Sequence, residues 1–156
     1  MSLSKFTFTG NLCRTDDFSG TPWVELPSGR LFSQGGFAAW LVTSPDPRVA
    51  GEMESYNMVF NVRGGFFPGQ TLEGNAHAHF TLYPTVGSGT WEGVFECLYK
   101  IEDGTNYHTL ILNGHGTGDF QGMVIKIKET HEIPFATSMA CWMPEAEPWP
   151  FNGHIK

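Results

Sequence analysis

Glycine occupies every second position at the start of one segment, at Gly114, Gly116 and Gly118, and an alternating apolar and polar run follows at residues 123–129. Because glycine has no side chain, it lets a strand bend sharply and leaves room on a crowded face. The segment is not typical of a phosphate-binding loop, because no Gly-Lys-Ser or Gly-Lys-Thr ending and no helix pattern follow it. We therefore predict a bent strand at the corner of a β-barrel.

The rest of the chain has the two-residue alternation of strands, and no long window has the period of a helix. Turn signals such as Asp103-Gly104 separate the runs. The expected strands are residues 5–12, 37–43, 54–63, 74–83, 90–102, 107–113 and 123–133, with residues 23–26 as a candidate edge strand. A closed antiparallel β-barrel of about eight strands leaves no unpaired edge. We predict this all-β fold as a single domain over residues 1–156, with a β-sandwich as the alternative.

Three finer features follow from the same patterns. Within residues 54–63 one strand face is expected to carry the large apolar side chains, Tyr56, Met58, Phe60 and Val62. Residues 48–54 are expected to make a short helical turn. The Pro- and Trp-rich tail at residues 142–151 has too many large apolar groups for a free end, so we expect it to cover a barrel opening or to contact another subunit.

Charge and cysteine content limit the classes of function. The net charge is -7, and the basic residues form no cluster beyond Lys126 and Lys128, so nucleic acid is not an expected partner. The start of the chain lacks a signal-peptide pattern and no apolar run is long enough to span a membrane, which indicates a soluble cytoplasmic protein. Cys13, Cys97 and Cys141 are odd in number without CxxC spacing, which favours free thiols over a disulfide framework or a zinc site.

Two stretches together resemble a known superfamily. Trp91-Glu92-Gly93-Val94-Phe95 and the glycine-rich segment 114–122, with a hairpin between them, are similar to the small-barrel superfamily that includes allene oxide cyclase and the DUF3224-type bacterial proteins. The resemblance implies an eight-stranded barrel whose apolar interior holds a lipid-like or other hydrophobic ligand, and often an oligomer. No catalytic residue of the cyclases can be matched to a position of this chain, so the resemblance does not extend to cyclase activity.

Five polar residues are the candidates for catalysis. His77 and His79 lie on one strand face, as metal-binding histidines do in barrel enzymes, but the glutamate that a cupin-like metal site needs is absent, so neither a metal nor an organic cofactor is expected. Glu92 and Glu96 are separated by roughly 13 Å along their strand, too far for a paired acid and base. His115 lies between two glycines in the bend. The parity of the strands predicts that the His77 and Glu92 faces point outward, where charge pairing alone explains them.

Aromatic side chains are the candidates for ligand binding, although a packed barrel core needs them equally. The candidates lie on the apolar faces of the predicted strands and are Tyr56, Phe60, Phe80, Trp91, Phe95 and Tyr99. The leading hypothesis is a small barrel that binds a hydrophobic molecule in or at its mouth. The alternatives are a cofactor-free isomerase, cyclase or lyase that uses a cavity histidine or glutamate, and a structural module that forms homo-oligomers.

Overall fold

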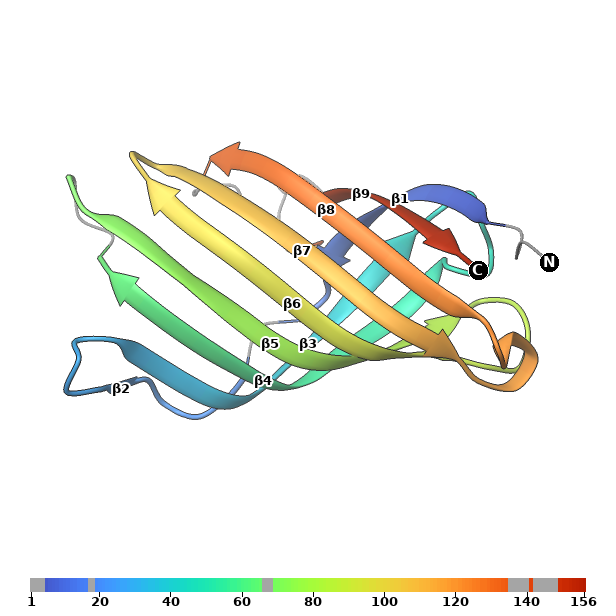
Figure 1. Ribbon diagram of the computed structural model, residues 1–156, viewed down its shortest axis with the longest axis horizontal. Coiled ribbons are helices and arrows are strands. Elements are labelled where there is room, and N and C mark those ends of the chain that lie inside the picture. The colour runs from blue at the N-terminus through green and yellow to red at the C-terminus, as the bar shows by residue number, and fades with distance from the viewer. Residues whose placement is uncertain (1–4, 17–18, 66–68, 135–140, 142–148) are drawn as a thin grey trace.

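The computed structural model describes residues 5–16, 19–65, 69–134, 141 and 149–156. Strands dominate the described residues, and the one short helical element is a 3-10 turn, η1 (Gly118–Phe120). The strands are β1 (Phe6–Arg14), β2 (Val24–Glu25), β3 (Leu31–Thr43), β4 (Gly51–Gly64), β5 (Thr71–Pro84), β6 (Trp91–Glu102), β7 (Thr105–Gly116), β8 (Val124–Pro134) and β9 (Trp149–Ile155) (Figure 1).

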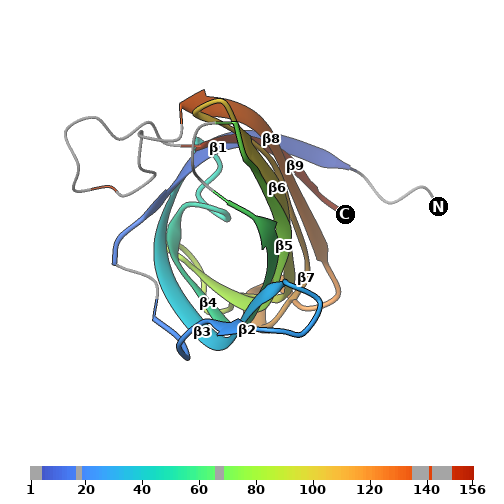
Figure 2. The ribbon, with the colours of Figure 1, turned by 90° about the vertical axis from the view of Figure 1, so that its left-hand side faces the viewer.

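The strands form one antiparallel sheet that closes on itself. Its order is β1-β9-β8-β7-β6-β5-β4-β3, and β1 also pairs with β3, which completes a ring of the eight described strands other than β2. Viewed from one end, these strands surround a common axis (Figure 2). The predicted all-β, closed antiparallel barrel is confirmed, and β2 is the edge strand expected near residues 23–26. Among the described residues, no helix has the length and apolar character needed to cross a membrane.

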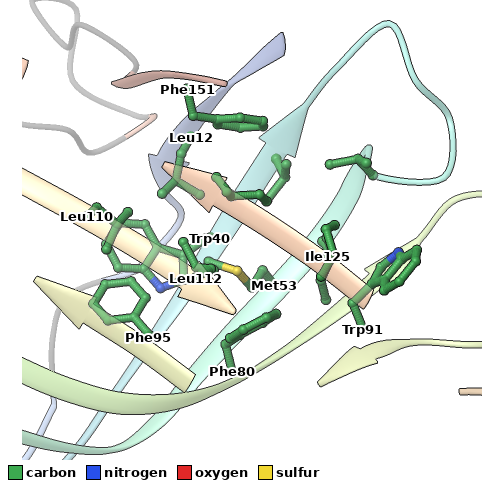
Figure 3. Close-up of a cluster of buried hydrophobic side chains, with 14 of the residues drawn as sticks. Leu12, Trp40, Met53, Phe80, Trp91, Phe95, Leu110, Leu112, Ile125 and Phe151 are labelled. Atoms are coloured by element: carbon green, nitrogen blue, oxygen red, sulfur yellow. The ribbon is translucent and has the colours of Figure 1, made fainter. Parts of the chain in front are cut away.

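The middle of the barrel is filled by side chains in layers. One layer crosses four neighbouring strands, because Ala78 pairs with Phe95, Phe95 with Leu112, and Leu112 with Ile127. All four side chains are buried, and they belong to one continuous core cluster. Phe95 and Leu112 are shown with other members of the cluster in Figure 3. Burying a large apolar side chain of this kind contributes about 1.5–3 kcal/mol. The expected inward faces of β5 and β6 are thus confirmed.

The glycine-rich segment ends β7 and connects it to β8. A Cβ atom at Gly114 would lie 2.8 Å from Cζ of Phe80, so the bare glycine makes room for that ring. Gly116 similarly faces the backbone and Cβ of Phe120. The chain then turns through η1 and Gly122, whose φ is +85° and favours glycine. The predicted bend of a crowded barrel strand is confirmed.

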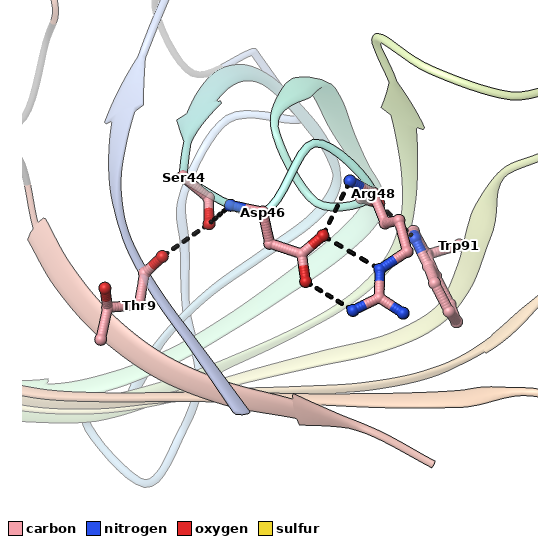
Figure 4. A network of polar contacts seen from close by, with 5 residues as sticks. All are labelled: Thr9, Ser44, Asp46, Arg48 and Trp91. Atoms are coloured by element: carbon pink, nitrogen blue, oxygen red, sulfur yellow. Dashed lines mark hydrogen bonds and ion pairs between the residues drawn. The ribbon is translucent and has the colours of Figure 1, made fainter. Parts of the chain in front are cut away.

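The connection between β3 and β4 closes the end of the barrel at which Trp91 lies. The Arg48 side chain donates two hydrogen bonds to Asp46, at 3.0 and 2.7 Å, and these hold the pKa of Asp46 below its usual value (Figure 4). The indole Nε1 of Trp91 donates to the carbonyl of Arg48 at 2.8 Å, and its ring stacks on Phe120 at 5.0 Å. The predicted helical turn at residues 48–54 is therefore wrong, because a hydrogen-bonded turn at residues 46–50 leads directly into β4.

A bulge in β4 changes the parity predicted for that strand. Tyr56 pairs with His79 but the next paired residue is Val59, and Asn57 has a φ of 52°. One extra residue in the strand turns the side chains before it to the opposite face. Met58 is buried whereas Tyr56 lies outside and stacks on His79 at 5.8 Å between ring centroids. The expectation that Tyr56 shares a face with Met58 is therefore wrong.

Two further corrections concern the end of the chain. Residues 149–151 begin β9, which pairs with both β1 and β8 and so forms part of the barrel wall rather than a cover. Residues 142–148 of the expected tail lie outside the described residues. Cys13 and Cys141 form a disulfide with their Cα atoms 5.3 Å apart, so the prediction of three free thiols is wrong, and Cys97 alone is free.

Candidate functional site

A pocket of about 760 Å³ opens at the end of the barrel opposite Trp91. Inward-facing apolar side chains of β3 to β6 form its wall, among them Leu31, Phe60, Val62, Leu72 and Ile101. Trp23, just before β2, covers Phe60, with 5.6 Å between the two ring centroids. Because the middle of the barrel is filled, this end is where the interior has room for a small molecule.

Polar side chains face the interior on the neighbouring strands at the same level. Tyr99 on β6 pairs with His108 on β7, and His108 pairs with His131 on β8, so the three form a row across the inner wall. Glu129 lies one layer deeper, opposite Leu110. This strand geometry brings together the His108–Glu129–His131 cluster, a group that the sequence patterns did not single out.

The cluster is deeply buried and closely spaced. Nε2 of His108 lies 2.8 Å from Oε2 of Glu129, and Nδ1 of His131 lies 3.9 Å from Oε1 of the same carboxylate. The exposed fraction of the side chain is 0% for His108, 1% for Glu129 and 20% for His131. The ring of Trp149 from β9 packs on His108, with 3.8 Å between centroids. The strand that completes the barrel therefore also covers the cluster.

The polar atoms of this cluster lack ordinary hydrogen bonds within the described protein. Neither ring nitrogen of His108, neither oxygen of Glu129, nor Nε2 of His131 has a partner with hydrogen-bond geometry, and the same holds for Nε1 of Trp149. His108 and Glu129 are therefore in electrostatic contact at 2.8 Å, but the geometry of this contact is not that of a hydrogen bond. Because buried polar groups are nearly always paired in proteins, such a concentration marks a candidate site.

The apolar pocket and the polar cluster adjoin. Tyr99 lines the apolar pocket and pairs with His108 of the cluster, whereas a second hollow, of about 710 Å³, lies on the outer face of β4 to β8, where exposed side chains such as Leu98 and Tyr107 line it. A molecule in the open end would therefore meet a mainly apolar wall with a few polar groups, among them Ser33 and Tyr99. That combination of an apolar pocket with a few convergent polar groups is typical of small-molecule sites.

Burial keeps two neighbouring groups of the site in their protonated form. Desolvation, with a smaller contribution from the charge of Glu129, raises the pKa of Cys97 to about 12. Burial, and then the neighbouring Cys97, raises the pKa of Tyr99 above its usual value. At neutral pH, Cys97 is therefore a thiol rather than a nucleophilic thiolate, and the Tyr99 hydroxyl is a hydrogen-bond donor.

The five candidate catalytic residues lie on the outer faces of their strands. Nδ1 of His77 lies 3.5 Å from Oε1 of Glu96 with both side chains more than half exposed, and His79 stacks on Tyr56. Glu92 accepts a hydrogen bond from Thr90, and His115, its cross-strand partner, is exposed. These residues face away from the pocket, as strand parity predicts for the His77 and Glu92 faces.

The six aromatic candidates are divided among three environments. Phe60 and Tyr99 line the open-end pocket. Phe80, Trp91 and Phe95 are buried in the core, and Tyr56 lies outside. Parity could have identified the inward polar residues. His108 lies on the same strand face as Leu110 and Leu112, and Glu129 lies on the same face as Ile125 and Ile127. A charged side chain on the apolar side of a strand was the available signal.

Neither metal-binding groups nor similarity to known proteins assigns a function to this site. Within the described ranges, no group of three or more histidine, cysteine, aspartate or glutamate side chains could hold a metal ion. No family model, curated protein or solved structure matches this chain. The resemblance to allene oxide cyclase and the DUF3224-type proteins therefore stays a prediction.

Proposed function

We propose that this protein binds a small hydrophobic molecule in the open end of its barrel. The observation that carries the proposal is the pocket of about 760 Å³ whose wall is formed by inward apolar side chains. Pockets of a few hundred Å³ or more with mainly apolar walls are the usual sites for small organic ligands. The packed core below the pocket confines such a molecule to the open end.

Binding of the fluorescent probe 1-anilinonaphthalene-8-sulfonate tests this proposal. The probe should bind the native barrel, and Leu31→Glu should weaken its binding at least tenfold, because an unpaired charge in an apolar wall opposes binding. Val94→Glu is the matched control, since Val94 is 44% exposed and lies on the outer face of β6. Equal binding by both variants and the native protein would contradict a site in the open end.

A cofactor-free isomerase, cyclase or lyase is the second candidate. The buried pair of His108 and Glu129 beside the pocket favours it, because a carboxylate next to an imidazole is a common arrangement for a general base. Its test is deuterium exchange from solvent at the α-carbon of a bound apolar ketone, 2-acetonaphthone, measured for the native protein and for Glu129→Gln. Exchange no faster than in buffer would count against this reaction class.

The remaining expectations stay predictions. The mass of the protein in solution would show whether it forms a homo-oligomer. A binding measurement at low salt would test the expectation that nucleic acid is not a partner. The Cys13–Cys141 disulfide speaks against the expected cytoplasmic location, because disulfides persist in oxidising compartments.

A further inference from the structure

We infer that the ligand of the open-end pocket is an uncharged molecule with a hydrogen-bond-accepting group, such as a ketone or an ester, and that the hydroxyl of Tyr99 donates to this group. This inference rests on the proposed binding of a hydrophobic molecule, and it names the chemical class of that molecule. Its starting point is the place of Tyr99, a phenol in a wall that is otherwise mainly apolar.

Tyr99 lies on the inward face of β6. Its neighbour Leu98 points outward and is 63% exposed, and the two-residue alternation of a strand places Tyr99 on the opposite face together with Ile101, which lines the same pocket. The cross-strand partner of Tyr99 on β5 is Gly74, which has no side chain to cover the phenol. The ring of Tyr99 therefore borders the free volume of the open end.

The other inner hydroxyls of the wall are already engaged within the protein. Oγ of Ser33 donates to the carbonyl of Thr21 at 2.8 Å, and the Thr21 hydroxyl donates to the backbone of β3 at 2.9 Å. Ser19 and Trp23 are exposed, so water satisfies their polar groups. The hydroxyl of Tyr99, by contrast, forms no hydrogen bond within the described part of the chain. It is thus the inner donor that remains for a ligand.

The Tyr99 hydroxyl is protonated at neutral pH, because burial raises its pKa above the usual value. In the empty pocket, water accepts its hydrogen bond. A ligand that displaces this water must accept the bond in its place, since a hydroxyl left unpaired away from water loses free energy. A hydrocarbon cannot accept, whereas a carbonyl oxygen can. The pocket should therefore select a molecule with an acceptor at the level of Tyr99.

The same wall has no partner for a charge. Among the described residues that line the pocket, none is a lysine, arginine, histidine, aspartate or glutamate. A carboxylate or an ammonium group would lose its water there without gaining an opposite charge, and this costs more than a single hydrogen bond returns. An uncharged acceptor reaches the Tyr99 hydroxyl without that cost.

Matched naphthalene probes test the acceptor and the charge separately. The ketone is 2-acetonaphthone, and 2-isopropenylnaphthalene has the same shape with a methylene group in place of the oxygen. The acid 2-naphthoate adds a negative charge. Equilibrium dialysis against the full chain measures each Kd. The ketone should bind more tightly than the acid, and the ratio of hydrocarbon Kd to ketone Kd is then compared between variants, because the solvation of the free probes cancels in that comparison.

Tyr99→Phe removes the oxygen alone. The ratio should fall about three- to tenfold in this variant, as the loss of one neutral hydrogen bond predicts. Its melting temperature should not fall, because no hydrogen bond within the protein is lost. Tyr107→Phe is the matched control, since Tyr107 is 42% exposed on the outer face of the next strand, and it should leave the ratio unchanged. The infrared carbonyl band of bound 2-acetonaphthone should lie at a lower frequency in the native protein than in Tyr99→Phe.

The outcomes distinguish the inference from the proposed function. An unchanged ratio in Tyr99→Phe, or an unchanged carbonyl frequency, would overturn the inference while the pocket still binds hydrophobic molecules. Tighter binding of 2-naphthoate than of 2-acetonaphthone would overturn the uncharged class. If no naphthalene probe binds, and 1-anilinonaphthalene-8-sulfonate does not bind either, the proposed function itself fails.

Discussion

His108 and Glu129 approach each other at 2.8 Å with both side chains essentially inaccessible to solvent, whereas His77 and Glu96 approach at 3.5 Å on the outside of the same barrel. The two pairs have the same chemistry and differ in burial. A buried charge that loses its partner cannot be compensated by water, whereas an exposed charge can. The protein thus contains its own control for measuring what the buried pair contributes.

Glu129→Leu should lower the free energy of unfolding by about 3 kcal/mol or more, because it leaves His108 buried without its partner. The double variant with His108→Phe should recover most of this loss, since both polar groups are then replaced by apolar ones. Urea unfolding measures both values. Glu96→Leu should change stability by less than about 1 kcal/mol. A similar loss in both single variants would show that burial of the pair has no special effect.

Gly114→Ala should destabilise the barrel by about 1–3 kcal/mol, because the new methyl group meets a filled core. Its Cβ would lie 2.8 Å from Cζ of Phe80 and 2.8 Å from the backbone oxygen of Glu92. In a Phe80→Leu background the substitution should have a smaller effect, since one of the two contacts is relieved. A thermal or urea unfolding series measures this double-mutant cycle, and an unchanged effect would mean that Phe80 is not the obstacle.

Parity and turn chemistry predicted the fold, and they failed where the structure departs from a regular pattern. The inward faces of β5 and β6 follow directly from alternation, and Asp103-Gly104 makes the expected tight turn, with φ of 50° and 75°. The bulge at Asn57 could not be predicted from the sequence, because the two-residue spacing of the large apolar residues in β4 continues through it. The sequence of β9 is short and contains Pro150 and Gly153, so it reads as a loop until its neighbours β1 and β8 are known.

The candidate site was harder to predict than the fold. Sequence patterns point to polar residues that are grouped along the chain, as His77 and His79 are. The buried cluster instead consists of residues on two strands that come together only through the β7–β8 pairing. The Cys13–Cys141 disulfide is a similar case, because a separation of 128 residues gives no local signal. Long-range contacts of this kind depend on topology.

Removing the disulfide should have a large effect on stability. Cys13→Ala with Cys141→Ala should lower the free energy of unfolding by about 4–5 kcal/mol in the chain-entropy account, since the bond closes a loop of more than a hundred residues. Urea unfolding with and without reductant measures the loss. Thiol titration of the denatured protein should find one thiol before reduction and three after it. Three thiols before reduction would contradict the pairing.

The partly buried thiol of Cys97 should make the barrel less stable in alkaline solution. The pKa of Cys97 is raised from 9.0 to about 12, so above pH 9 the unfolded chain releases this proton while the folded barrel keeps it. The folded state then binds more protons, and the free energy of unfolding falls by up to about 1.4 kcal/mol per pH unit. Cys97→Ala should remove this part of the slope between pH 9 and 11. Identical slopes would show that the thiol titrates normally in the barrel.

The barrel is closed by β9, the last strand in the chain, which pairs with β1 at the other end of the sequence. During synthesis, β8 and β1 therefore have an unpaired edge until residues 149–155 have left the ribosome, and exposed strand edges promote association between chains. Trp149 arrives with the same strand and packs on His108, so the candidate site is also completed last. An unfinished chain thus has neither a closed wall nor a covered cluster, and the molecule gains both in a single late step.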